Sequence, residues 1–212
     1  MSLRVAQILV GGFDDNFSYL LYDEATKEAA YIDPTGNTEL VTERTAELGL
    51  IIVAIWITHT HFDHIDKLNL ALAHYPVPVF VHERGAGRLG DVVPQALSEG
   101  SILALGNTEI AALYTPGHLD DSVCFYSEDT ASAPILITGD TLFVEGCGRT
   151  NEKEVEDLYN SLQRLKTLPP ETILYPGHDY GTTPTSTIGR ELQNNKYLLV
   201  QNFAEFKKLR LG

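Results

Sequence analysis

Three histidines and two aspartates fall within nine consecutive residues, 58–66, directly after a continuously apolar run. That run, 51–57, is bounded by polar residues, which is typical of a strand covered on both faces. Packing does not account for so many imidazoles and carboxylates together, whereas a loop leaving a rigid strand can direct alternate side chains at one point. These are ligand types for zinc, iron or manganese, so the segment predicts a metal site. Its candidate ligands are His59, His61, Asp63 and His64.

Three further candidate ligands follow other predicted strands. His118 and His178 each end a Pro-Gly-His triplet, a tight turn that presents an imidazole, and Asp140 follows the apolar run 135–138. Four loops at strand ends therefore offer ligands to one site. His74 and His82 lack such a setting, and we interpret them as ordinary histidines.

Strand and helix patterns alternate along the chain. The segment 37–48 predicts a helix with an Asn cap, and a second helix is predicted after a capping box of Asn151 and Glu154. The tail 186–211 is predicted to be mostly helical. Strands are predicted at 4–10, 18–22, 29–32, 51–57, 77–81, 102–105, 109–114, 122–126, 135–138 and 172–175. Interleaved elements without a low-complexity linker predict one layered α/β domain over residues 1–212.

The charge of the chain restricts its partners. The formal net charge is −14, which repels phosphate backbones and anionic membrane surfaces, so we expect a small-molecule partner and neither nucleic acid nor membrane. No apolar run approaches the roughly 20 residues that cross a bilayer, and no signal peptide is apparent, so a cytoplasmic location is expected. Cys124 and Cys147 form no Cys-x-x-Cys pair and are expected to be structural thiols.

The motifs together resemble those of the metallo-β-lactamase superfamily, from about residue 5 to residue 200. The resemblance rests on the His-x-His-x-Asp-His of 59–64, the two Pro-Gly-His turns and the Gly-Asp-Thr-Leu-Phe of 139–143. It implies a four-layer αβ/βα sandwich, in which two mixed sheets are flanked by helices. The segment 139–150 is similar to the glyoxalase II and persulfide dioxygenase branches rather than to the antibiotic-hydrolysing one.

The resemblance also implies how the ligands divide between two divalent ions, zinc or else iron or manganese. The first ion is assigned to His59, His61 and His118, and the second to Asp63, His64 and His178, with Asp140 as the bridge. In persulfide dioxygenases the pattern is instead a single iron, held by the equivalents of His59, His118 and Asp140.

By this resemblance the preferred function is hydrolysis of a hydroxyacylglutathione-like thioester, in which a hydroxide bound to the metals attacks the carbonyl carbon. Asp63 is the catalytic candidate, orienting the hydroxide, and Arg149 and Tyr180 are candidates for contact with substrate. Only 34 residues follow His178, so we expect no long helical substrate-binding domain of the classical glyoxalase II kind.

Other functions remain open from the sequence. An iron-dependent dioxygenase acting on glutathione persulfide is favoured by Gly-Cys-Gly-Arg-Thr at 146–150. It is disfavoured by Phe62 and Asp66, where that branch has alanine and threonine, and by Leu-Asp-Asp at 119–121. Three further functions are less favoured: a partner of a flavin module, a nuclease and a metal-binding protein without turnover. The first two are usually accompanied by a flavin domain or an inserted domain, and we expect neither within these 212 residues.

Overall fold

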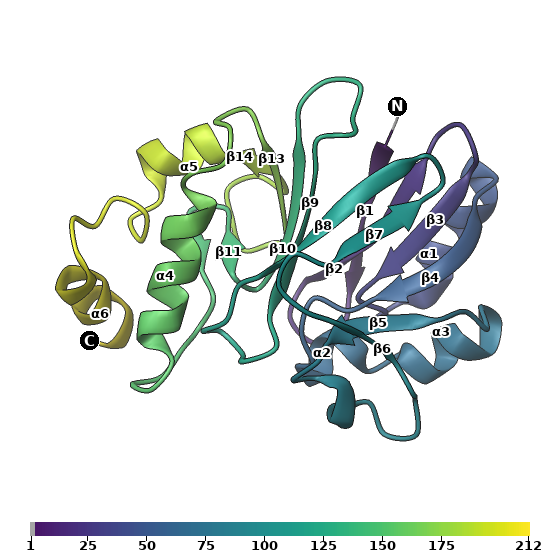
Figure 1. The fold of residues 1–212 in the computed structure, drawn as a ribbon, viewed down its shortest axis with the longest axis horizontal. Helices are drawn as coiled ribbons and strands as arrows, with labels where there is room; N and C mark the ends of the chain where they lie inside the picture. The colour runs from purple at the N-terminus through teal and green to yellow at the C-terminus, as the bar shows by residue number, and fades with distance from the viewer. Residues whose placement is uncertain (1–2) are drawn as a thin grey trace.

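Two six-stranded sheets form the centre of the protein (Figure 1). The structure is a computed structural model, and it describes residues 3–212. In the first sheet, strands β1 to β3 are antiparallel and β3 to β6 are parallel, so the sheet is mixed. Its strands are β1 (Leu3–Gly11), β2 (Asn16–Asp23), β3 (Glu28–Ile32), β4 (Ile51–Trp56), β5 (Val79–His82) and β6 (Gln95–Leu97), in that spatial order.

The second sheet is also mixed, since β10 and β13 run parallel while the remaining neighbours are antiparallel. Its spatial order is β14 (Ser186–Thr187), β13 (Ile173–Pro176), β10 (Ile135–Gly139), β9 (Val123–Ser127), β8 (Thr108–Tyr114) and β7 (Ile102–Leu105). A short ribbon of β11 (Leu142–Phe143) and β12 (Gly146–Cys147) follows β10.

Apolar side chains of the two sheets form the central core. Tyr19 and Trp56 of the first sheet are buried with Phe125 and Ile137 of the second, and the Trp56 and Phe125 ring centroids lie 5.2 Å apart. Burying such rings removes large apolar areas from water and so stabilises the face-to-face packing.

Helices cover the outer face of each sheet (Figure 1). Helices α1 (Thr38–Leu48) and α3 (Leu68–His74) pack on the first sheet, and α4 (Val155–Leu165), α5 (Ile188–Asn194) and α6 (Phe203–Leu211) on the second. A short helix α2 (Phe62–Ile65) follows β4, and a 3₁₀ turn spans Ala86–Arg88. The predicted four-layer αβ/βα architecture is therefore confirmed.

Helix α1 begins and ends as predicted. The Asn37 side chain accepts a hydrogen bond from the Glu39 backbone N–H, and Gly49 closes the helix in a left-handed conformation with φ 63°.

One helix prediction was wrong in detail. Asn151 does not cap α4, because its side chain accepts from the Lys153 backbone N–H in a preceding turn and the helix begins only at Val155.

The tail is mostly helical, as predicted, and consists of two helices. The buried Asn195 side chain donates to the Gly146 carbonyl and to Glu191, which fixes the end of α5.

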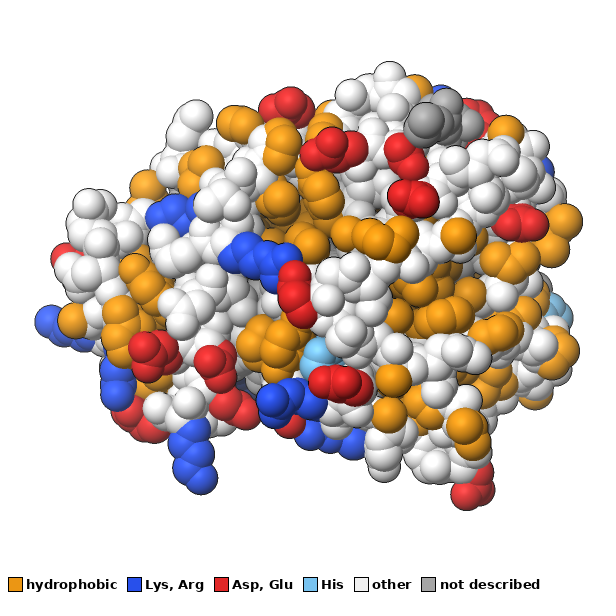
Figure 2. All heavy atoms as spheres, in the orientation of Figure 1, with side chains coloured by type: hydrophobic (Ala, Val, Ile, Leu, Met, Phe, Trp, Pro, Cys, Tyr) orange, Lys and Arg blue, Asp and Glu red, His pale blue; other side chains and the backbone are white. Residues whose placement is uncertain are grey.

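The charged side chains of both signs are mixed on the surface. On the face shown in Figure 2, lysine and arginine side chains are interspersed with acidic ones, and no extended basic patch is visible there. Within residues 3–212, no helix combines the length and the apolar character that crossing a bilayer requires.

Candidate active site

The four predicted ligand loops meet at one edge of the two sheets. The loop after β4 carries His59, His61 and the two ligands of α2, while β8, β10 and β13 lead to His118, Asp140 and His178 respectively. The structure brings all seven candidate ligands together, in three overlapping groups within each of which the ligand atoms lie within 4.8 Å of one another. Two of these groups have no residue in common, and the third joins them through Asp140, His59 and His64.

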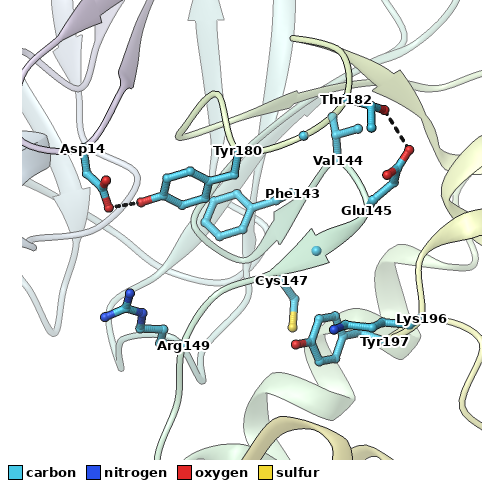
Figure 3. A pocket seen from close by; sticks show the side chains of 12 residues that line it. Asp14, Phe143, Val144, Glu145, Cys147, Arg149, Tyr180, Thr182, Lys196 and Tyr197 are labelled. Atoms are coloured by element: carbon cyan, nitrogen blue, oxygen red, sulfur yellow. Dashed lines mark hydrogen bonds between the residues drawn. The ribbon is translucent and has the colours of Figure 1, made fainter.

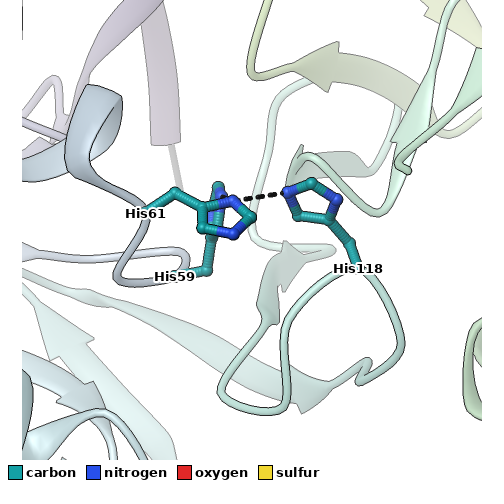
Figure 4. Close-up of side chains that lie close together, drawn as sticks. All are labelled: His59, His61 and His118. Atoms are coloured by element: carbon teal, nitrogen blue, oxygen red, sulfur yellow. Dashed lines mark hydrogen bonds between the residues drawn. The ribbon is translucent and has the colours of Figure 1, made fainter. Parts of the chain in front are cut away.

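The first group consists of three imidazoles that face one another (Figure 4). His61 Nδ1 lies 3.1 Å from His59 Nε2 and 2.8 Å from His118 Nε2. Two nitrogen ligands at ordinary distances from one tetrahedral ion are about 3.3 Å apart, so these separations are close to those of a ligand triplet.

The second group joins Asp63, His64 and His178. The Nε2 atoms of the two histidines are 3.3 Å apart, and Asp63 Oδ2 lies 3.4 Å from His178 Nε2 and 3.7 Å from His64 Nε2. The Asp63 side chain is 26% exposed, while His64 is fully buried, so Asp63 is the member of this group that solvent reaches most readily.

Asp140 lies between the two groups. Its carboxylate is 3.2 Å from His64 Nε2 and 3.2 Å from His178 Nε2 in the second group, and 3.4 Å from His118 Nε2 and 4.0 Å from His59 Nε2 in the first. This is the position of a ligand shared by two ions.

Hydrogen bonds on the far side of three rings determine which nitrogen faces the cluster. His118 Nδ1 lies 2.9 Å from the Arg149 carbonyl oxygen, His178 Nδ1 lies 2.6 Å from the Asp14 carbonyl oxygen, and His64 Nδ1 lies 2.9 Å from Asp33 Oδ2. Because these oxygens accept, each Nδ1 carries a proton and each Nε2 faces the cluster. Metal-binding histidines are oriented in this way.

The donor set fits divalent cations for a second reason. Asp140 Oδ1 is buried, and although His64 Nε2 lies 3.2 Å away, no group among the described residues is aligned to donate a hydrogen bond to it, which is costly for a buried carboxylate oxygen. A cation bound between the two groups would satisfy it. The chemistry of the donors, imidazole and carboxylate, agrees with zinc, iron or manganese.

The electrostatics of the cluster point the same way. Burial and the charge of His64 lower the pKa of His59 well below its usual value, and burial lowers the pKa of His118 to about 4. Burial also opposes a charge on His64, but Asp140 and Asp33 outweigh it and raise the pKa of His64 well above its usual value. The cluster thus favours the neutral form of His59 and His118 and places positive charge on His64, beside Asp140, which is the charge that a bound cation would supply there.

Sequence reasoning missed the residues that hold the ligand loops in place. The buried Asp33 accepts hydrogen bonds from the backbone N–H and hydroxyl of Thr58, in addition to its contact with His64. Asp121 accepts from the backbone N–H and hydroxyl of Thr60, which joins the β4 loop to the loop of His118. Asp33 directly follows the predicted strand 29–32, so its place at a strand end was the available signal.

The glycines of the two Pro-Gly-His turns are required by close approach. A Cβ on Gly177 would overlap Asp140 Oδ1, and a Cβ on Gly117, whose φ is +126°, would overlap the backbone of Leu158. No residue with a side chain could therefore replace either glycine without displacing these neighbours.

A cavity of about 670 Å³ adjoins the cluster (Figure 3). Tyr180 lies at its wall, stacked on the His178 ring at 4.6 Å, and its hydroxyl donates to the Asp14 carboxylate. Asp14 and Arg149 lie at one end of the cavity, and Lys196 lies at the other. The structure thus places both predicted substrate contacts, Arg149 and Tyr180, on this cavity.

The remaining histidines and the cysteines lie outside the three groups. His82 is buried and stacked on Tyr114 at 4.1 Å, and His74 is exposed against Tyr75. Both thiols are buried, and burial raises the pKa of Cys124 to about 11 and that of Cys147 to about 12, which suits structural cysteines.

Comparison with known proteins agrees with this fold. Residues 11–178 match the model of the metallo-beta-lactamase superfamily. The chain therefore belongs to that superfamily, as its motifs predicted.

Three similar proteins illustrate which members of the superfamily the chain resembles. The chain is 30% identical over 202 residues to a probable polyketide biosynthesis zinc-dependent hydrolase, BaeB, of Bacillus velezensis, covering 92% of this chain and 87% of that protein. It is 37% identical over 171 residues to a hydroxyacylglutathione hydrolase of Hahella chejuensis, covering 81% of this chain but only 64% of that enzyme. The crystal structure of ETHE1 from Myxococcus xanthus superposes with a TM-score of 0.84 at 31% identity, covering 100% of this chain and 91% of that one.

Proposed function

We propose that the protein is a metal-dependent hydrolase of the glyoxalase II type, which cleaves a thioester of a glutathione-like thiol. The observation that carries the proposal is the seven-residue cluster, in which inward-facing Nε2 atoms of both groups surround the buried Asp140 carboxylate at 3.2 to 4.0 Å. The similarity to hydroxyacylglutathione hydrolases supports the same reaction class.

The ligands divide between two divalent ions in this proposal, and zinc is the preferred metal. His59, His61 and His118 hold one ion, Asp63, His64 and His178 hold the other, and Asp140 contacts both. Divalent ions in such a site supply Lewis acidity, which polarises a carbonyl and makes water nucleophilic at neutral pH.

The chain's own groups orient the reactants. Asp63 is held by Asn16, whose Nδ2 donates to its carbonyl oxygen at 3.0 Å and to Oδ2 at 3.1 Å, so its carboxylate is fixed at the solvent-accessible side of the cluster. There it orients the attacking water and accepts its proton. The water oxygen bonds to the carbonyl carbon, the carbon–sulfur bond breaks, and the thiolate leaves with the electron pair and takes up a proton.

The cavity beside the cluster suits the thiol arm of the substrate. Arg149 and Lys196 both line it, and among residues 3–212 neither has a carboxylate within ion-pair distance. Among the described residues, eight of the 15 lysines and arginines have no carboxylate at that distance, and Arg149 and Lys196 are the two of these that line the cavity. We infer that they bind the carboxylates of the thiol carrier, as a glutathione thioester would require.

The test compares two carriers of the same acyl group. We expect wild-type protein to hydrolyse S-lactoylglutathione, and we expect Arg149→Gln and Lys196→Gln each to raise its KM roughly fivefold, because a partly exposed ion pair is lost. Lactoyl-N-acetylcysteamine, which lacks carboxylates, should show an unchanged kcat/KM in both variants. Release of free thiol measures each rate.

Lys153→Gln is the matched control, because Lys153 is an exposed lysine away from the cavity. Absence of thiol release from either thioester would contradict the hydrolase. Hydrolysis of both with equal KM in all variants would contradict only the role of Arg149 and Lys196.

A second candidate uses the same cluster. An iron-dependent persulfide dioxygenase is favoured by the structural likeness to ETHE1, and its single iron would be held by His59, His118 and Asp140. The complete second group, with His64 Nε2 and His178 Nε2 3.3 Å apart beside Asp63, favours the hydrolase over it.

A further inference from the structure

Two phenylalanines are strongly exposed beside the candidate active site. Phe13 is 80% and Phe62 is 64% exposed, and their rings are in edge-to-face contact with centroids 5.8 Å apart. Single exposed apolar residues are common on protein surfaces, but two exposed rings held against each other form a small apolar surface that water solvates poorly. We refer to these two side chains as the aromatic pair.

The aromatic pair is attached to the cluster through both of its segments. Phe62 stands between the candidate ligands His61 and Asp63, at the start of α2. Phe13 precedes Asp14, whose carbonyl oxygen accepts from His178 Nδ1 at 2.6 Å and whose carboxylate accepts from Tyr180. Each phenylalanine is therefore a chain neighbour of residues that contact or belong to the cluster.

A third residue joins the two segments. Asn16 is fully buried in β2, three residues after Phe13, and its side chain donates to the Asp63 backbone and carboxylate one residue after Phe62. The two rings are thus carried on segments that are hydrogen-bonded together, and the pair is a defined feature rather than a chance contact of two loops.

The aromatic pair lines a different hollow from the cavity that Arg149 and Lys196 line. Asp14 lines the cavity that holds Arg149, whereas Phe13 and Phe62 line a separate hollow of about 560 Å³, whose wall also includes Val10 and the polar Asn37, Asp66 and Lys67. Phe13 and Asp14 therefore belong to two different hollows, one that carries the aromatic pair and one that carries charged side chains of both signs. A thioester has two arms of different chemistry that diverge from its carbonyl carbon.

We propose that the aromatic pair binds the acyl arm of the substrate and gives the protein a preference for thioesters of bulky apolar or aromatic acids over small ones. The inference rests on the proposed hydrolase function. In that proposal Arg149 and Lys196 bind the thiol arm of the thioester, and the aromatic pair binds the acyl arm on the other side of the carbonyl carbon. An acyl chain covering roughly 50 Å² of apolar ring surface corresponds to about a tenfold gain in kcat/KM.

The experiment uses the metal-loaded protein and two substrates with the same carrier, S-phenylacetylglutathione and S-acetylglutathione. We expect the wild-type ratio of their kcat/KM values to exceed the ratio in Phe62→Ser, and in Phe13→Ser, by about tenfold. The rate with S-acetylglutathione should change less than about twofold, because neither ring is a candidate metal ligand. Val93→Ser is the matched control, since Val93 is 93% exposed and absent from both cavities.

Each other outcome overturns the inference in a recognisable way. Equal kcat/KM ratios in the wild type and both phenylalanine variants would contradict acyl binding while leaving thioester hydrolysis intact. An unchanged ratio together with a dimer-to-monomer shift in Phe62→Ser, measured by light scattering, would assign the pair to contact with a second copy. Failure to hydrolyse either thioester would remove the proposed function itself, and the inference with it.

Discussion

Replacing Asp140 by asparagine is expected to lower kcat/KM for thioester hydrolysis by at least about 10³-fold, or roughly 4 kcal/mol of transition-state stabilisation. The carboxylate lies within 3.2 to 4.0 Å of a ring nitrogen of four histidines drawn from both groups. An amide has nearly the same shape but no charge, so it cannot neutralise two neighbouring cations. Metal content, measured by plasma mass spectrometry alongside the kinetics, should fall in the same variant.

Asp179→Asn provides the matched control. Asp179 directly follows His178, is exposed, and is tied to the fold through its backbone N–H, which donates to the Asp15 carbonyl oxygen. We expect this variant to keep wild-type activity and metal content. An Asp140→Asn protein that is folded, fully loaded with metal and as active as wild type would contradict the shared-ligand role.

Removing the metals with a chelator is expected to abolish activity and to lower Tm by roughly 10 °C. The candidate ligands come from the loops after β4, β8, β10 and β13, so ions bound there join segments that are far apart in sequence. Metal present at about 10³ times its Kd stabilises the folded state by about 4 kcal/mol, and each kcal/mol changes Tm by about 2–4 °C for a chain of this size. Differential scanning calorimetry before and after dialysis against chelator measures the shift.

Readdition of zinc should restore both Tm and activity. In Asp140→Asn the chelator should produce a much smaller shift, because less metal is bound at the start. A chelated protein that has lost its metal yet unfolds at the original Tm would show that the four loops are held in place without it.

The sequence predicted the architecture and the gathering of the candidate ligands better than it predicted the supports of the site. The His-x-His-x-Asp-His segment and the Pro-Gly-His turns are local patterns, so the chemistry of each could be recognised without knowing its neighbours. Helix α1 was predicted for the same reason, because Asn37 and Gly49 are local signals for the beginning and the end of the helix.

The supporting contacts join residues that are distant along the chain. Asp33 meets Thr58 and His64, and Asn16 meets Asp63, over separations of 25 to 47 residues. No spacing rule connects such pairs, because the pairing of β2, β3 and β4 in the sheet brings them together. The aromatic pair depends on the same long-range placement.

One local prediction failed because a turn contact prevailed over propensity: Asn151 closes a turn with Lys153 instead of capping α4. The break in the helical tail at Asn195 was beyond local patterns, because it depends on a hydrogen bond to Gly146 of β12. Three-residue strands such as β6 carry too little periodicity to be recognised from sequence.

The most direct test of the account is the metal content of the purified protein, with thioester hydrolysis and persulfide-dependent oxygen consumption measured on the same sample. We predict two divalent ions per chain, zinc in preference to iron, with hydrolysis of S-lactoylglutathione and no oxygen uptake with glutathione persulfide. One iron per chain, with oxygen consumed and the thioester left intact, would contradict the hydrolase and assign the dioxygenase reaction to the same histidines and aspartate.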